Sequence, residues 1–398
     1  MTSRAGVARV DSLERRFLSG IFAELCRIES PSGRERACAE RVRAELGALG
    51  VSVQEDGAGP LTGSDCGNLL ARISAAGASA AAPATDAKRT LLLCAHLDTV
   101  PLQAPIEPVL VDGVWENANE GILGADNKAA IAVMLALARH VVRDGAPVDL
   151  ELLFTVGEET ALAGARALDA SCLRSDFGYV FDHASPIGEV IVASPTHFRL
   201  EASFRGVAAH AGIRPELGRS AILAAARAIA SMCIGRVDEE TTVNVGTISG
   251  GTAMNVVPDH SSFVAEVRSL SEERAETMAA EVVDRVHEAA NMPDCDCDAD
   301  VAVERMFSGY RLPPSAPAVR AAEASLRACG HEPLRIASGG ASDANALIAK
   351  GLQTVNLANG TERNHEPGER VSEAALEQML GVALALLDGA ALASDGAR

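Results

Sequence analysis

The chain has 398 residues, of which 48% are hydrophobic and only 3% are aromatic, and its formal net charge is −19. This length is too great for one ordinary core and predicts two or three domains. The negative charge argues against nucleic acid or an anionic membrane as a partner, because both are themselves negatively charged.

The first fifty residues predict two amphipathic helices. One apolar stripe at helical spacing is formed by Leu13, Phe17, Ile21, Leu25 and Ile28. Residues 30–33 interrupt it, and a second helix is expected over residues 37–49. Residues 1–18 contain no uninterrupted apolar segment, so we expect no signal peptide, and no run approaches the roughly twenty apolar residues of a membrane helix.

A buried strand over residues 91–95 leads to the first candidate site residues. Before it, residues 74–88 are almost wholly small or polar, and we interpret them as a flexible surface insertion. His96 and Asp98 follow the strand at a spacing of two, so their side chains project from the same side. The pair can serve as a metal ligand and the group that orients it, or it can cap the next turn.

Asp126 lies at the start of an unbroken apolar helix over residues 129–138. A carboxylate is favoured there by the helix dipole, although N-capping alone also explains one Asp. Upstream, Trp115 lies in a predicted loop over residues 109–120. The loop either lines a pocket or covers the core, and we favour the core.

Two more apolar strands end in acidic residues. Residues 150–156 are followed by Gly157, Glu158 and Glu159, and residues 179–181 by Asp182 and His183. Adjacent carboxylates are costly in a crevice unless a cation lies beside them. Three strands with acidic or His residues at their ends predict a common site.

Residues 196–307 predict an inserted βαββαβ unit, an antiparallel sheet with two helices on one side. His210 stands alone there in a turn of small residues. Cys295 and Cys297 lie among three aspartates, where we favour a solvent-exposed loop over a metal site. The nine cysteines follow no pairing rhythm, which favours a reducing compartment and a cytoplasmic location.

The first domain resumes after the insertion, so residues 1–195 and 308–398 are expected to form one discontinuous α/β domain. Its C-terminal part contains His365 in a polar loop. Five side chains from five separate segments can then meet: His96, Asp126, Glu159, Asp182 and His365. Nitrogen and carboxylate ligands without thiolate suit zinc, with Mn²⁺ or Co²⁺ as alternatives.

Five ligands suffice for two ions if one carboxylate bridges them, and a bridged pair can hold a hydroxide. Glu158 is then suited to take a proton from that water. Residues 96–98, 123–129, 157–159, 181–182, 206–212 and His365 resemble the co-catalytic di-zinc exopeptidases, the family that includes peptidase T, glutamate carboxypeptidase and aminoacylase. Residues 214–218, 235–242 and 338–345 are similar to the peptidase-T-like branch.

The resemblance implies a zinc-exopeptidase-type mixed sheet flanked by helices, with a ferredoxin-like lid domain at residues 196–307 that forms a homodimer. It implies that Asp126 bridges two zinc ions, that His96 and Asp182 hold one, and that Glu159 and His365 hold the other. Asp98 would orient His96. Glu158 would act as general base and then as general acid.

In the lid, the resemblance implies that His210 stabilises the oxyanion and that Asn255 and Arg268 contact substrate. A surface ion pair is the alternative for Arg268. The branch usually has Asp where this chain has Asn127, so we expect altered metal affinity. His183 is excluded as a ligand because neighbouring strand residues face opposite ways.

The third carboxylate ligand is Asp182. In having Asp at this position, the chain resembles the aminopeptidase-like and dipeptidase-like members of the family. The resemblance therefore implies a metal-dependent aminopeptidase that hydrolyses the N-terminal bond of dipeptides or tripeptides. The alternatives are a zinc-dependent deacylase or carboxypeptidase acting on N-acyl amino acids, and a catalytically silent binding protein with the same fold.

Overall fold

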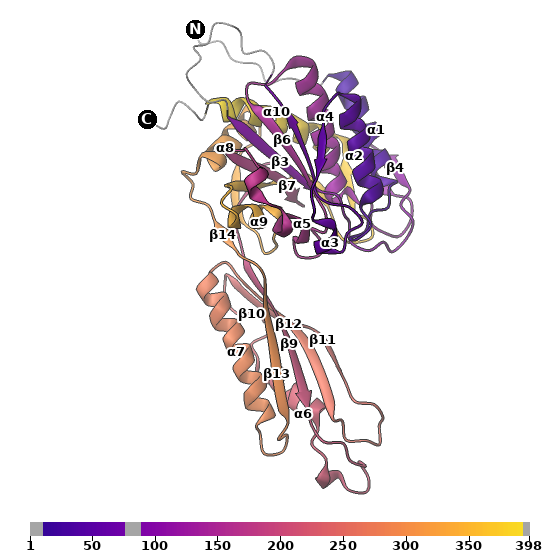
Figure 1. Ribbon diagram of the computed structural model, residues 1–398, viewed down its shortest axis with the longest axis vertical. Helices are drawn as coiled ribbons and strands as arrows, with labels where there is room; N and C mark the ends of the chain where they lie inside the picture. Colours follow the sequence, from indigo (N-terminus) through magenta and orange to yellow (C-terminus); the bar gives the residue numbers. More distant parts are fainter. Residues whose placement is uncertain (1–10, 76–88, 393–398) are drawn as a thin grey trace. The chain divides into compact units, whose positions relative to one another are not determined.

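The computed structural model describes residues 11–75 and 89–392 (Figure 1). Contacts divide the chain into two compact units, a large unit formed by Met1–Val192 with Leu312–Arg398 and an inserted unit formed by Ala193–Arg311. Nearly all of the predicted surface insertion at residues 74–88 lies outside the described residues.

The large unit is built on a nine-stranded mixed sheet with the strand order β1-β2-β6-β3-β7-β16-β8-β14, in which β15 also pairs with β8. Its central strands β6, β3, β7 and β16 are parallel. Strand β3 is buried along almost its whole length, as expected for a parallel strand covered on both faces. The strands are β1 (Val53–Glu55), β2 (Leu69–Ile73), β3 (Thr90–His96), β6 (Asp149–Thr155), β7 (Phe177–His183), β8 (Glu189–Ser194), β14 (Tyr310–Arg311), β15 (Leu334–Ala337) and β16 (Thr354–Ala358).

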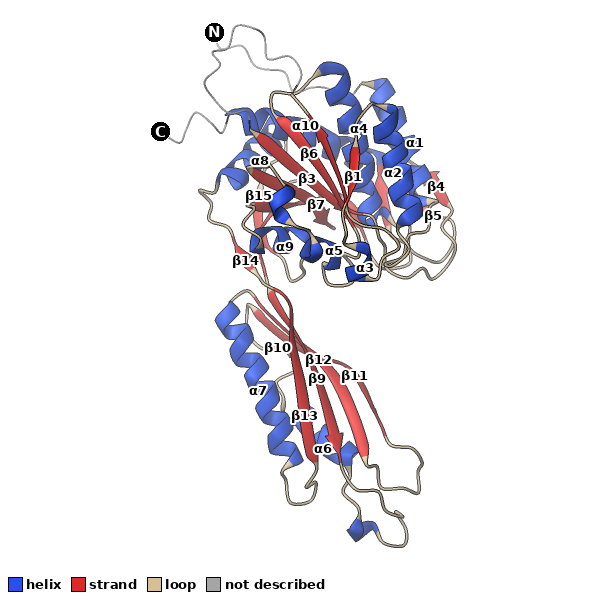
Figure 2. Cartoon of the chain, viewed as in Figure 1, coloured by secondary structure: helices blue, strands red, loops and turns tan. Residues whose placement is uncertain are grey.

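Helices pack around this sheet (Figure 2). Helix α4 is buried from Ala125 to Ala138, which explains why the sequence there lacks a polar face. Helix α1 begins at a capping box in which the side chains of Asp11 and Glu14 each accept a hydrogen bond from the other's backbone amide. The helices are α1 (Ser12–Cys26), α2 (Arg36–Ala48), α3 (Gly59–Thr62), α4 (Ala125–Asp144), α5 (Ala163–Ala167), α8 (Pro317–Ala328), α9 (Asp343–Ala349) and α10 (Glu373–Leu392).

Helix α10 is apolar over 19 residues, with a mean hydropathy of 1.4, and is long enough to cross a membrane. The expectation that no segment approaches this length is therefore wrong for α10. In the structure 61% of that stretch is buried, and the helix packs against α4 and α8. Its composition is accounted for by a place in the core of the large unit.

A second, four-stranded sheet has the order β17-β18-β5-β4. Its strands are β4 (Pro108–Val111), β5 (Val114–Asn117), β17 (Thr361–Glu362) and β18 (Arg370–Ser372). Trp115 therefore lies on a strand and not in the predicted loop, and its ring packs edge-on against Phe22 at 6.1 Å. Pairing of β17 with β18 closes the loop that carries His365.

The inserted unit has a five-stranded antiparallel sheet in the order β10-β11-β12-β9-β13. Its two long helices contact each other and the sheet, and the element order is the predicted βαββαβ with the short β10 added. The elements are β9 (Thr196–Arg205), α6 (Ala221–Ser231), β10 (Gly235–Arg236), β11 (Thr241–Gly250), β12 (His260–Ser269), α7 (Glu272–Ala290) and β13 (Asp298–Phe307).

Cys295 and Cys297 do not form the solvent-exposed loop that the sequence favoured. Both side chains are buried in the hydrophobic core of the inserted unit, with exposures of 1% and 7%. Burial raises the pKa of both thiols, so they are kept in the neutral form. The neighbouring aspartates, which suggested exposure, lie outside this core.

Candidate metal centre

The parallel strands of the large sheet bring their carboxyl ends to one edge. His96, the last residue of β3, pairs in register with Thr155, the last residue of β6. The turn after β6 carries Glu158 and Glu159, and the neighbouring strand β7 carries Asp182. The strand ends of an α/β sheet are where ligand crevices form, so the register itself assembles these side chains.

Asp98 fixes the orientation of His96. The Nδ1 atom of His96 lies 3.0 Å from the carbonyl oxygen of Asp98 and 3.3 Å from its Oδ1 atom. Because both are acceptors, Nδ1 carries a proton, and Nε2 is the ring nitrogen that faces the other side chains of the group. The Asp98 carboxylate also accepts the backbone amides of Glu158 at 3.0 Å and Glu159 at 3.1 Å. One carboxylate thereby positions the imidazole and both glutamates.

Asp126 lies between the two imidazoles. Its Oδ1 atom is 3.2 Å from Nε2 of His96, and its Oδ2 atom is 3.2 Å from Nε2 of His365. His365 Nε2 also lies 2.9 Å from Oε1 of Glu159, and His96 Nε2 lies 3.7 Å from Oδ1 of Asp182. The five predicted ligands therefore converge, with one Asp126 oxygen turned to each half of the group.

The charges of this group call for a cation. Burial and the charge of Asp126 raise the pKa of Asp182 to about 7, and burial together with Asp182 raises the pKa of Glu158 well above its usual value. Four carboxylates in a buried site repel one another, and two divalent ions would balance their charge. Glu158 is buried, and its carboxylate lies within 4.8 Å of ligand atoms of His96 and Asp182.

The donor set fits divalent metal. Glu159 Oε1 is buried and makes no hydrogen bond within the described ranges, although the ring nitrogen of His365 is close to it. His365 Nε2 and Glu159 Oε1 thus face each other without hydrogen-bond geometry, an arrangement that suits two ligands of one ion. Two imidazoles and three carboxylates without thiolate suit zinc, manganese or cobalt.

Three residues that support this group escaped the sequence analysis. Glu369 is buried and accepts the backbone amides of Leu123, Gly124 and Asp126, each at 2.8 Å. Asn364 donates to Asp126 Oδ2 at 2.9 Å, and Ser32 donates to Asp98 at 2.7 Å. Of the three, only Asn364 could have been suspected from the sequence, because it is next to His365.

Asp343 lies beneath the group at the start of α9. It accepts the hydroxyl of Thr155 at 2.5 Å, and its other oxygen is buried without a hydrogen-bond partner in the described chain. Burial raises the pKa of Asp343 to about 6. Asp343 belongs to the segment that resembled the peptidase-T-like branch, but the sequence assigned it no role.

His183 and Asn127 flank predicted ligands. His183 Nε2 lies 3.6 Å from Glu189 Oε2, so its ring is turned toward that neighbour. Asn127 is fully buried, and neither side-chain polar atom has a hydrogen-bond partner among residues 11–75 and 89–392. An effect of Asn127 on metal affinity stays a prediction.

The remaining predicted site residues belong to the inserted unit. His210 and Asn255 are exposed and adjacent, because His210 forms a β-bridge with Val256. Arg268 lies on β12, where its guanidinium donates to Glu266 at 3.1 Å. The structure therefore brings His210 and Asn255 together. Arg268 forms an ion pair, which the sequence analysis gave as the alternative to substrate contact.

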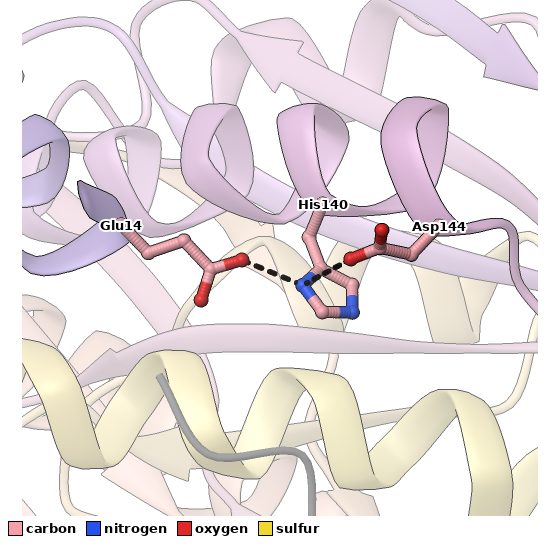
Figure 3. Close-up of side chains that lie close together, drawn as sticks. All are labelled: Glu14, His140 and Asp144. Carbon is pink, nitrogen blue, oxygen red and sulfur yellow. Dashed lines mark hydrogen bonds and ion pairs between the residues drawn. The ribbon is translucent and has the colours of Figure 1, made fainter. Parts of the chain in front are cut away.

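A second cluster in the large unit has metal-ligand side chains, namely Glu14, His140 and Asp144 (Figure 3). His140 Nδ1 lies 2.7 Å from Glu14 Oε1 and 3.6 Å from Asp144 Oδ2. Arg143 already donates to these two oxygens, at 2.7 and 2.6 Å. The guanidinium supplies the positive charge, and the cluster is an ion-pair network that joins α1 to α4.

An α/β sheet whose strand ends gather two imidazoles and several carboxylates is the architecture of a metal-dependent hydrolase. Residues 92–389 match the family described as Peptidase family M20/M25/M40, and the chain belongs to this family. It is 35% identical to the uncharacterized protein YqjE of Bacillus subtilis (strain 168) over 382 residues, which cover 95% of this chain and 99% of that protein.

Solved structures agree with this assignment. The aminopeptidase PepT from Bacillus cereus ATCC 10987 has a TM-score of 0.85 at 35% identity, and a tripeptidase from Staphylococcus aureus subsp. aureus Mu50 has 0.88 at 32%. Each match covers 95% of this chain and 99% of the other. The chain is thus a metallopeptidase of this family, with an aminopeptidase and a tripeptidase as structural neighbours.

Two further similarities have lower sequence identity. A dinuclear metal-binding peptidase of the M20 family from Bacillus subtilis shares the fold, with a TM-score of 0.71 at 17% identity over 95% of this chain and 99% of that one. A protein of Paracoccidioides brasiliensis (strain Pb03), named "Probable carboxypeptidase", is 30% identical over 317 residues, which cover 72% of this chain and 70% of that protein.

Proposed function

We propose that this chain is a two-metal exopeptidase that removes the N-terminal residue from short peptides, with tripeptides and dipeptides as substrates. The observation that carries the proposal is the convergence of two imidazoles and three carboxylates beside Glu158, which is buried next to His96 and Asp182. The 35% and 32% identities to an aminopeptidase and a tripeptidase support the substrate class.

In this proposal Asp126 would be shared by two metal ions, since its two oxygens face different imidazoles. His96 and Asp182 would hold the first ion, and Glu159 and His365 would hold the second. Zinc is the proposed metal, with Mn²⁺ and Co²⁺ as alternatives that the same donors accept. When bound, the metal pair supplies Lewis acidity and lowers the pKa of water at the site.

Side chains of the protein carry out proton transfer and position the groups of the site. Glu158, buried beside His96 and Asp182, takes a proton from the attacking water and returns it to the leaving amine. Asp98 keeps His96 in one tautomer and, through the amides of Glu158 and Glu159, fixes the turn that carries both glutamates. Glu369 holds the turn before Asp126 in the same way.

The inserted unit is proposed to supply His210 to the oxyanion and Asn255 and Arg268 to the substrate. His210 and Asn255 are exposed side by side, which supports a shared role. To bind a substrate carboxylate, Arg268 would have to break its ion pair with Glu266. A double-mutant cycle on Glu266 and Arg268, with KM measured separately from kcat, tests that exchange.

A homodimer through the inserted unit is part of the proposal. Beyond Val243 the outer edge of β11 pairs with no strand in the described ranges, and Ile248 on that strand is 54% exposed. An open edge with an exposed apolar side chain is suited to pair with a second copy. A cytoplasmic location is likewise proposed, supported by nine free cysteines.

A carboxypeptidase or deacylase is the second candidate, and the 30% identity to the fungal protein named as a carboxypeptidase favours it. Peptides that differ only at their ends separate the two functions. An aminopeptidase cleaves a tripeptide with a free amine and a C-terminal amide, and it leaves the N-acetylated peptide with a free carboxylate intact. A carboxypeptidase or deacylase has the opposite preference.

A further inference from the structure

A pocket of about 480 Å³ lies in the large unit between α1, α10 and the β4–β5 hairpin, and it contains none of the proposed metal ligands. Its volume falls within the range of small-molecule sites, about 300–1,000 Å³. The lining residues are Arg15, Arg16, Leu18, Ser19, Gly20, Leu110, Trp115, Glu373, Leu376 and Glu377. The proposed catalytic residues do not use this pocket.

Part of the lining is apolar. Leu18 and Leu376 are buried, with 1% of each side chain exposed, and Trp115 is half-buried beside them. Leu110 is 44% exposed at the mouth of the pocket. This part of the lining suits a branched or aromatic side chain, whose burial contributes roughly 1.5–3 kcal/mol when complete.

The rest of the lining carries charges of both signs. Arg15 and Glu377 pair with each other at 3.3 Å. Arg16 donates through Nε only to the carbonyl of Ser12, and its terminal nitrogens have no acceptor within the described residues. Glu373 accepts the hydroxyl of Ser19 at 2.6 Å, and no cation pairs with it there. One cation from α1 and one carboxylate from α10 therefore remain uncompensated.

We propose that this pocket binds a small apolar zwitterion, an α-amino acid or dipeptide with an aliphatic or aromatic side chain. Its carboxylate pairs with Arg16, its ammonium group pairs with Glu373, and its side chain lies against Leu18, Trp115 and Leu376. Guanidinium and carboxylate groups form strong charge-assisted hydrogen bonds. The choice of ligand rests on the proposed function, because hydrolysis of short peptides releases these zwitterions.

The test uses the indole as its reporter. Trp115 is the only tryptophan in the chain, so tryptophan fluorescence reports on this pocket alone. L-leucine and L-phenylalanine, which the enzyme does not hydrolyse, are titrated into metal-loaded, full-length protein with calorimetry in parallel. We expect saturable binding with a Kd of about 1 mM or tighter, and much weaker binding of N-acetyl-L-leucine and L-leucinamide.

The variants locate the ligand. Arg16→Ala and Glu373→Gln should each raise the Kd about tenfold or more, which corresponds to about 1.4 kcal/mol. Arg320→Ala, an exposed arginine on α8 outside the pocket, should leave the Kd unchanged. Titration of the chelated protein should give the same Kd, because the pocket contains no proposed metal ligand.

Three results would overturn the proposal: no saturable binding by either method, binding that both pocket variants leave unchanged, or equal binding of the two blocked ligands. Failure of the proposed function looks different. In that case the protein hydrolyses no free-amine peptide, while leucine still binds and the pocket variants still weaken it.

Discussion

The carboxylate of Glu369 accepts the backbone amide of Asp126 at 2.8 Å, although the two residues are 243 positions apart in the chain. The same carboxylate also accepts the amides of Leu123 and Gly124. Glu369 therefore fixes the backbone that aims both Asp126 oxygens at the imidazoles. Within residues 11–75 and 89–392 only these three amides hydrogen-bond to the buried Glu369 carboxylate, and burial raises the pKa of Glu369 to about 7.

Glu369→Gln should lower stability by about 1–3 kcal/mol, because the amide replaces one acceptor oxygen by a donor and leaves buried N–H groups unpaired. It should also weaken metal retention through misplacement of Asp126. Thermal unfolding and metal content after dialysis measure the two effects. Glu366→Gln changes an exposed carboxylate in the same loop and serves as the control. Equal behaviour of the two variants would remove the role assigned to Glu369.

Glu158→Gln should reduce kcat by about 10²–10⁴-fold, the usual contribution of a general base. The metal content should stay at the wild-type level, because Glu158 is not a proposed ligand. Rates on a tripeptide and metal analysis of the same sample give both values. A variant that keeps its rate, or one that loses its metal, contradicts the assignment.

Asp182→Asn and His183→Gln form a matched pair on adjacent positions of β7. Loss of even an outer partner of a metal ligand costs about 10–100-fold in metal affinity, so Asp182→Asn should weaken one site by at least that much. His183→Gln should leave both sites intact, because its ring faces Glu189. Competition with a chelator measures each affinity. Metal loss in His183→Gln would show that His183, and not only Asp182, contributes to the metal site.

Glu266 gives the inserted unit a pH dependence. The neighbouring His197 and Arg268 lower the pKa of Glu266 from 4.5 to about 2, although burial opposes this. The folded pKa is below the unfolded pKa, so the stabilisation is present above pH 4.5 and is lost as pH falls toward 2. Wild type should therefore exceed Glu266→Gln in unfolding free energy at pH 6, and this difference should shrink on acidification. A difference that is constant between pH 6 and pH 3 would contradict this account.

The sequence predicted the residues at the strand ends because strand register alone brings them together. His96, Glu158, Glu159 and Asp182 each follow an apolar strand, and parallel pairing of those strands fixes a common edge. His365 had no such local signal. Its position depends on β17 and β18, which are two and three residues long and too short to recognise from a pattern.

Other features depend on tertiary contacts that no local pattern carries. Glu369 looked like an ordinary polar residue before a helix, and only its burial against residues 123–126 gives it a role. Cys295 and Cys297 were misjudged because their acidic neighbours suggested exposure, whereas the thiols turn into the core. Helix α10 was underestimated because three charged residues, Glu373, Glu377 and Asp388, interrupt its apolar run.

The most direct test of the central claim is hydrolysis of one tripeptide in two forms, with a free amine and N-acetylated, by zinc-loaded protein before and after chelation. The account predicts cleavage of the free-amine form alone, with loss of that activity on chelation and recovery when zinc is returned. Cleavage of the acetylated form, alone or together with the free-amine form, would replace the aminopeptidase by a carboxypeptidase or deacylase. Cleavage that persists at full rate in metal-free protein would contradict the two-metal mechanism itself.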